Sequence, residues 1–131
     1  MTTKGLSVIT VCMNRQQHLQ ATAVRVAEFA HHQEHLVLDW SSREPLRRDQ
    51  LPSDSRIRLE RVEGETCWNL CRAYNVAAQL AHGDVLLKLD ADCWPEHIDP
   101  ALHLKTVSDV CWFGSGLGWV GLVGLFVCWL V

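Results

Sequence analysis

Four short runs of apolar and β-branched residues recur along this 131-residue chain, beginning near residues 6, 35, 56 and 84. They constrain its fold more than any other feature. The runs near residues 6 and 35 are almost wholly apolar, as is typical of strands buried on both faces of a sheet. The run from Arg56 to Glu60 instead alternates between charged and apolar residues. This alternation predicts a strand with one solvent-exposed face, near an edge of the sheet.

Helical segments separate these runs in two places. The first spans residue 16 to about residue 33, where apolar residues recur at helical spacing: Leu19, Ala23, Val26 and Ala30. The second is expected to begin at the capping residue Thr66, to run to about Ala81, and to be followed by Gly83 in a left-handed conformation. The order β-α-β-loop-β-α-β predicts an α/β fold around a mostly parallel sheet.

Polar residues follow three of the four predicted strands. In parallel sheets ligands bind at the carboxyl ends of the strands, so these positions are candidates for a binding site. The groups are Asn14 with Arg15, Asp39 with Ser41 and Ser42, and Asp90 with Asp92.

Asp90 and Asp92 are the strongest candidates among these. Residues i and i+2 of an extended chain point the same way, so both carboxylates can face one small volume. Hard anionic oxygens suit Mg²⁺ or Mn²⁺, which complete their shells with water and substrate phosphates. The structural alternative is a capped turn before Pro95.

Asp39 and Arg72 are weaker candidates when each is taken alone. The Asp39 carboxylate can accept a hydrogen bond from a ribose hydroxyl or a base N–H, or it can cap a turn. Arg72 can reach a phosphate or a uracil from its helix, or it can be an ordinary solvated charge. Asn75 lies three residues on and shares its helix face.

Composition argues against several classes of partner and site. The net charge of −3 provides no basic stripe for nucleic acid. The start of the chain lacks the pattern of a signal peptide, which predicts a cytoplasmic setting with reduced thiols. Cys67 and Cys71 are expected to be structural, because no second pair of matching spacing completes a zinc site. The histidines at 31, 32 and 35 are expected in a solvated turn.

The chain divides in composition after Asp109. All 27 charged residues lie at or before that position, and residues 110–131 contain none. We therefore expect one region at 1–109 and an apolar tail at 110–131. The tail has three interpretations: a truncated or frame-shifted product, a membrane tether, or a buried strand-and-turn segment. The first is favoured, and the second would make the protein membrane-associated.

Taken together, four motifs resemble those of family 2 glycosyltransferases. The run from Leu6 to Arg15 resembles their opening strand ending in P-T-Y-N-R, although Cys12 and Met13 replace the Thr and the aromatic residue. Their V-V-D-D-G-S element is similar to residues 37–42, where Trp40 and Ser41 replace the second Asp and the Gly. Their A-x-N helix with its A-x-G-[DE] ending resembles residues 71–84, and L-D-x-D matches residues 89–92. The resemblance covers about residues 6 to 98.

This resemblance implies the nucleotide-sugar half of a GT-A fold, the Rossmann-like fold of nucleotide-diphospho-sugar transferases, in a truncated form. It implies a hexosyltransferase that takes a UDP-sugar, with Asp39 on the uracil or ribose and Arg72 on the nucleotide. Asp90 and Asp92 would bind the nucleotide with Mn²⁺ or Mg²⁺. The acceptor, a glycan or a lipid, is not specified by the sequence.

No catalytic base is assigned from the sequence. After Asp92 the acidic residues are Glu96, Asp99 and Asp109, and the family's base lies farther along the chain. The alternative function is therefore a non-catalytic module that binds a nucleotide-sugar or a metal–nucleotide. An NAD-type oxidoreductase is disfavoured, because no G-x-G-x-x-G follows the first strand.

Overall fold

The structure is a computed structural model, and it describes residues 5–96. Its strands are β1 (Leu6–Cys12), β2 (Glu34–Trp40), β3 (Ile57–Val62) and β4 (Val85–Asp90), and its helices are α1 (Gln16–Glu28), α2 (Leu70–Leu80) and the short 3₁₀ helix η1 (Arg48–Gln50). The strands form one parallel sheet in the order β3-β2-β1-β4. This confirms the α/β fold with a parallel sheet, and β3 lies at an edge as its alternation predicts. The predicted tail at 110–131 lies outside the described residues.

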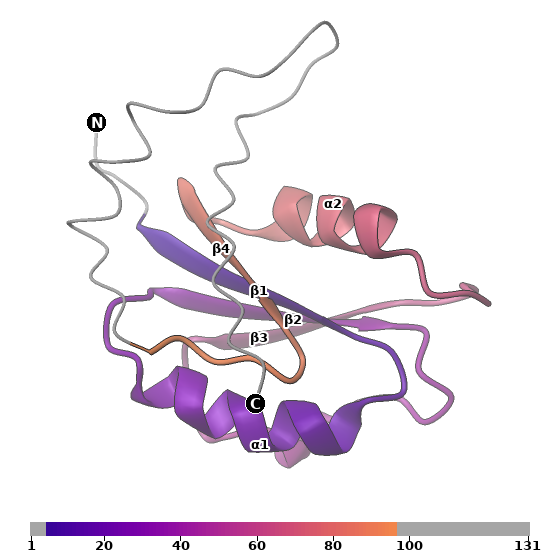
Figure 1. Ribbon diagram of the computed structural model, residues 1–131, viewed down its shortest axis with the longest axis horizontal. Helices are drawn as coiled ribbons and strands as arrows, with labels where there is room; N and C mark the ends of the chain where they lie inside the picture. The colour runs from indigo at the N-terminus through magenta and orange to yellow at the C-terminus, as the bar shows by residue number, and fades with distance from the viewer. Residues whose placement is uncertain (1–4, 97–131) are drawn as a thin grey trace, which may run out of the picture.

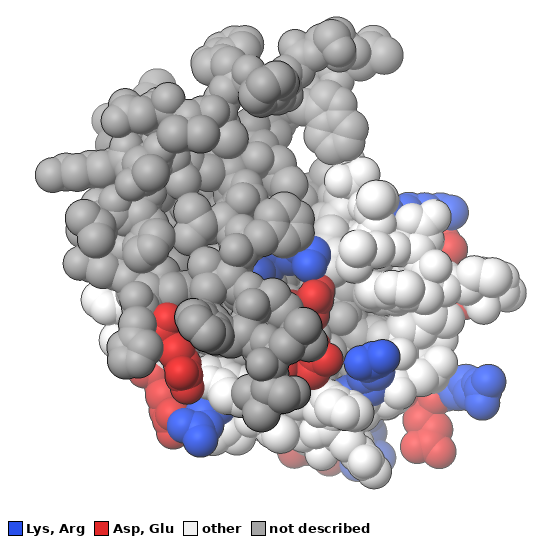
Figure 2. Space-filling model, in the orientation of Figure 1, with Lys and Arg blue, Asp and Glu red and all other residues white. Residues whose placement is uncertain are grey.

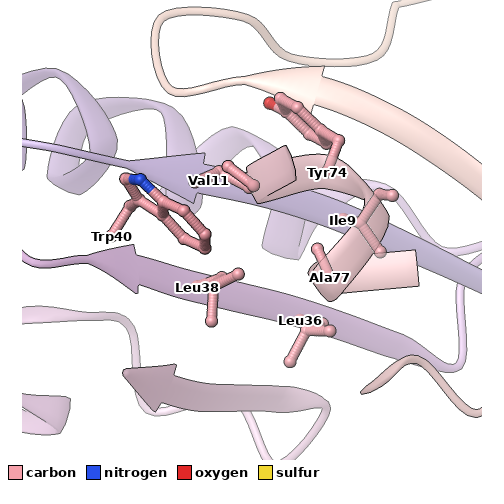
Figure 3. Packing of buried hydrophobic residues seen from close by; sticks show 8 residues of the cluster. Ile9, Val11, Leu36, Leu38, Trp40, Tyr74 and Ala77 are labelled. Carbon is pink, nitrogen blue, oxygen red and sulfur yellow. The ribbon is translucent and has the colours of Figure 1, made fainter. Parts of the chain in front are cut away.

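The two helices cover opposite faces of the sheet (Figure 1). Because successive strand residues point to opposite faces, each strand contributes to two cores. On the α2 face, β1 and β2 pack against the helix in one cluster: Ile9, Val11, Leu36, Leu38, Trp40, Ala73, Tyr74 and Ala77 (Figure 3). On the α1 face, Leu19, Ala23 and Val26 pack against alternate residues of the same sheet, such as Val8, Cys12 and Val37. The helices therefore pack against β1 from both faces of the sheet, and this packing holds the carboxyl end of β1 in place.

Both helices are shorter than their sequence patterns predict. α1 ends at Glu28, because Phe29 takes an extended conformation, whereas the prediction extended to about residue 33. α2 begins at Leu70 and not near Thr66. Its N-cap is Asn69, whose side chain accepts a hydrogen bond from the Arg72 amide at 3.0 Å. The prediction chose the wrong capping residue because Asn and Thr are both good caps and lie close together in sequence.

Gly83 is not in the left-handed conformation predicted for it. Within residues 5–96 the glycines with positive φ are Gly5 and Gly64. Gly83 instead leaves room for a close approach, since a Cβ atom there would lie 2.6 Å from Ser7 Oγ and 2.7 Å from Gly5 O. The Gly83 amide also donates to Ser7 Oγ at 2.8 Å. The glycine is required by packing at the start of β4 and not by a helix end.

His32 and His35 do not lie in a solvated turn as predicted. Both are buried, and His31 is exposed. His35 is on β2, where its Nε2 lies 3.0 Å from Thr10 Oγ1. Burial, together with the nearby charges of His32 and Arg56, lowers the pKa of His35 to about 3, although Asp54 acts in the opposite direction. Burial likewise lowers the pKa of His32.

Because burial lowers the pKa of both histidines, we expect acid to destabilise the fold at a pH well above that at which carboxylates titrate. The unfolded chain binds a proton at His35 near pH 6.5, whereas the folded chain binds it only near pH 3. Stability is therefore complete above pH 6.5 and falls as the pH drops through that value. We expect the free energy of unfolding to be about 2 kcal/mol lower at pH 5 than at pH 8, as measured by urea titration. A free energy of unfolding that is the same at pH 5 and pH 8 would contradict the prediction.

No helix within residues 5–96 is long and apolar enough to cross a membrane.

Candidate functional site

A cleft of about 470 Å³ opens at the carboxyl ends of β1 and β4. Three segments that are far apart in sequence line it: the end of β1 and the turn after it, the residues around the start of α2, and the end of β4. The lining residues are Val11, Met13, Asn14, Arg15, Trp68, Leu70, Asp90, Ala91 and Asp92. Two of the three polar groups predicted at strand ends, Asn14 with Arg15 and Asp90 with Asp92, therefore lie together.

Asp90 and Asp92 both line this cleft, as their spacing predicts. Their side chains are 40% and 42% exposed, so a ligand can reach them. Asp90 Oδ1 accepts hydrogen bonds from Lys88 Nζ at 2.7 Å and from the Tyr74 hydroxyl at 3.1 Å. Asp92 Oδ2 lies 3.6 Å from an Arg15 guanidinium nitrogen. The cleft thus presents two carboxylates, each beside a basic side chain.

Tyr74 helps to hold Asp90 in place. Its hydroxyl also donates to the Leu89 carbonyl at 2.8 Å, so it ties the helix α2 to the last residues of β4. Burial raises the pKa of Tyr74, and the adjacent Asp90 raises it further. The phenol therefore stays protonated and remains a hydrogen-bond donor throughout the physiological pH range.

The donor set at the cleft fits a divalent cation that keeps part of its own hydration shell. No group of three or more potential ligand side chains occurs within residues 5–96, so the ligands from this part of the chain would be the Asp90 and Asp92 carboxylates. Mg²⁺ and Mn²⁺ are commonly held by one or two carboxylates together with water and substrate phosphates. A phosphate-bearing ligand would also contact Arg15, which lines the same cleft.

Asp39 does not line the cleft. Its side chain is 0% exposed. Oδ1 accepts from the Ser42 amide at 3.0 Å, and Oδ2 accepts from the Leu46 amide at 3.0 Å and from Arg61. Burial acts to lower the pKa of Arg61, but the hydrogen bond and charge of Asp39 outweigh it, so the pKa is raised. The carboxylate therefore orders the segment after β2, and its contact with a nucleotide stays a prediction.

The segment that Asp39 orders is joined to the cleft through Asn14. The Asn14 amide donates to Ser42 Oγ at 2.9 Å, and Asn14 Oδ1 accepts from the Arg43 amide at 2.8 Å. Asn14 and Ser41 have φ values of 57° and 52°, in the left-handed region that non-glycine residues adopt uncommonly. Backbone strain of this kind concentrates at binding sites, where surrounding contacts hold it.

Arg72 also lies outside the cleft lining. Its side chain is 64% exposed and forms an ion pair with Glu65 at 2.9 Å. The guanidinium carbon lies 5.9 Å from the centre of the Trp40 ring. Arg72 lies in the first turn of α2, two residues after Leu70, which lines the cleft. Its role in nucleotide binding stays a prediction.

Two residues that bear on the site were not singled out from the sequence. Lys88 lies two residues before Asp90 on β4, so strand alternation alone places the two side chains on one face. Trp68 precedes α2 and belongs to no motif, and only the fold brings it to the cleft. Basic and acidic side chains also lie side by side elsewhere on the described surface (Figure 2).

The parallel sheet with a helix on each face is a Rossmann-like α/β fold, and it is consistent with the GT-A fold. No protein-family model matches the chain, and no curated protein matches it in sequence. A solved structure with a similar fold is that of S. aureus TarS, residues 1–349, with a TM-score of 0.61 and 18% sequence identity. The match covers 80% of this chain and 32% of the TarS chain. This likeness concerns the fold, and the chain spans about a third of the length of the TarS chain.

Proposed function

We propose that this chain contributes the nucleotide-sugar-binding part of a family 2 glycosyltransferase of the hexosyltransferase type. The donor would be a UDP-sugar, bound with Mn²⁺ or Mg²⁺. The observation that carries the proposal is that Asp90 and Asp92, the two carboxylates of the L-D-x-D motif, face one cleft at the carboxyl edge of a parallel sheet. The Rossmann-like α/β fold, which is similar to that of S. aureus TarS, agrees with the same assignment.

Each residue at the cleft has a defined task in this proposal. Asp90 and Asp92 would hold the cation, and Lys88 and Tyr74 keep Asp90 in position. Arg15 would contact a phosphate oxygen, a contact that favours the negatively charged leaving group. The cation, when bound, would stabilise the charge that develops on the diphosphate as the glycosidic bond breaks.

Asp39 and Arg72 act at a greater distance in the same proposal. Asp39 fixes the segment that supports Asn14, and its contact with uracil or ribose rests on the family resemblance. Arg72 would approach the nucleotide from the first turn of α2 if it exchanged its ion pair with Glu65 for one with a phosphate.

Transfer also requires a base that deprotonates the acceptor hydroxyl, within about 3 Å of it. Among residues 5–96, the carboxylates that line the cleft are Asp90 and Asp92, and both are committed to the cation in this proposal. This favours a second candidate, a module that binds the nucleotide-sugar without transferring it. The acceptor, a glycan or a lipid, would be bound by a part of the protein beyond this region.

Binding of UDP by the full chain, measured by calorimetry, tests the proposal. We expect the affinity for UDP to be at least about tenfold higher with Mn²⁺ than with EDTA, a difference of about 1.4 kcal/mol. We also expect UDP to bind more tightly than ADP. Equal affinity with and without metal would contradict the metal site. Incubation with UDP-sugars and candidate acceptors then separates the two functions, since only the enzyme releases UDP together with a glycosylated product.

A further inference from the structure

We propose that Trp68 is the stacking surface for the nucleobase of the donor. This inference rests on the proposed function, because it assigns part of the ligand to a residue of the same cleft. Trp68 belongs to none of the sequence motifs, and its position at the cleft follows from the fold alone.

The exposure of Trp68 is the first observation. Trp68 is 48% exposed, which is unusual for a residue with so large an apolar side chain, and it lines the cleft. Leu70, which is 44% exposed, lines the cleft beside it. Two exposed apolar side chains at one concave site indicate a surface that a ligand covers.

The second observation is that the backbone on both sides of Trp68 is held. On one side, the Glu65 amide donates to Ser41 Oγ at 3.0 Å. On the other, Asn69 caps α2 through its bond with the Arg72 amide. The backbone that carries Trp68 is therefore held between the sheet and the helix, so little backbone entropy would be lost when a ligand binds against it.

The third observation is the division of the lining between elements. The carboxylates come from the end of β4, whereas Trp68 and Leu70 come from the start of α2, and Met13 comes from the end of β1. A nucleoside diphosphate has the same division into a charged end and a flat apolar end. In a nucleotide-sugar the transferred sugar is bonded to the diphosphate and would lie near the carboxylates. The nucleobase, at the other end of the molecule, would then lie against the apolar side chains.

The cleft is of a suitable size for this ligand. Small-molecule sites are commonly about 300–1,000 Å³, and this cleft has about 470 Å³. Stacking of a base on an aromatic side chain contributes about 5- to 150-fold in affinity per base. It requires only a flat face, so Trp68 would supply affinity while hydrogen bonds elsewhere choose between bases.

Calorimetry on the full chain with two probes, UDP and inorganic pyrophosphate, each with Mn²⁺, tests the inference. We expect Trp68→Ala to raise the Kd for UDP about tenfold or more and to leave the Kd for pyrophosphate unchanged within about twofold. Trp68→Phe, which keeps a flat aromatic face, should recover most of the UDP affinity. Trp68→Leu keeps apolar bulk without that face, and we expect it to raise the Kd for UDP as much as Trp68→Ala does. It therefore tests the inference even if the alanine variant folds poorly. Leu80→Ala, an exposed apolar residue away from the cleft, is the matched control.

The outcomes separate this inference from the function on which it rests. Unchanged UDP affinity in both Trp68→Ala and Trp68→Leu would overturn the stacking role while leaving the proposed function intact. An equal loss for UDP and pyrophosphate would also overturn it, because Trp68 would then support the whole cleft. Weaker binding of a UDP-sugar with unchanged binding of UDP would place Trp68 on the sugar and overturn the assignment to the base. A wild-type chain that binds neither probe would overturn both proposals.

Discussion

Replacing Asp92 with asparagine is expected to raise the Kd for UDP in the presence of Mn²⁺ by about tenfold or more. Asp92 is half of the charged donor set at the cleft. An amide oxygen is a poorer ligand for a hard cation than a carboxylate, and loss of one charged interaction costs about 1.5–3 kcal/mol. The substitution is nearly isosteric and Asp92 is 42% exposed, so the fold should be unaffected.

The same variant should behave in the opposite way when metal is removed. In the wild type, Asp92 lies 3.6 Å from Arg15 and competes with phosphate for that guanidinium. Asp92→Asn releases Arg15, so the affinity for UDP in EDTA should be equal to that of the wild type or higher. Asp49→Asn, which removes an exposed carboxylate outside the cleft, is the matched control and should change neither value. A uniform loss with and without Mn²⁺ would show that Asp92 does not act through a cation.

The strand pattern made most of the fold predictable. Four apolar runs and two periodic segments correspond to the four strands and two long helices, and the alternating run is the edge strand β3. The pairing of Asp90 with Asp92 in one cleft followed from strand geometry for the same reason. These features depend on local sequence, and tertiary packing did not override them.

What could not be predicted depends on neighbours that are distant in sequence. Gly83 looked like a helix end, but its constraint comes from Ser7, which lies beside it across the start of the sheet. His35 was expected in a solvated turn because it follows His31 and His32 near a predicted helix end, yet it is buried on the interior strand β2. Trp68 carried no motif, and the turn before α2 brings it to the cleft. Each of these required the pairing of strands to be known first.

Asp39 shows most clearly how the fold changes the interpretation of a motif residue. From sequence it is an acceptor at the end of a strand, available to a base or a ribose. In the structure its carboxylate is fully buried and is occupied by Arg61 and two backbone amides. Such a group is costly to desolvate unless every partner is present, so its main contribution is to the order of the loop.

Replacing Asp39 with asparagine is therefore expected to lower the free energy of unfolding by about 2–4 kcal/mol. The Asp39 carboxylate now accepts hydrogen bonds from two backbone amides and from Arg61. An asparagine amide has only one acceptor oxygen, so its NH₂ group would face one of these donors and the hydrogen bond would be lost. This value is lower than the cost of breaking a fully buried ion pair, because the Arg61 side chain is 27% exposed and water can solvate part of its charge. Urea unfolding gives the value, and Asp49→Asn, whose arginine pair is exposed, should change it by less than about 0.5 kcal/mol.

Nucleotide binding by the folded Asp39→Asn variant then decides what the residue does at the site. A direct contact with uracil predicts that UDP loses affinity while ADP does not, which would abolish the preference between them. A positioning role predicts that both affinities fall together, because the substitution acts through Ser42 and Asn14. With the carboxylate 0% exposed, we expect the two affinities to fall together. Loss of the preference alone, with stability unchanged, would restore Asp39 to the base-reading role that the sequence motif implies.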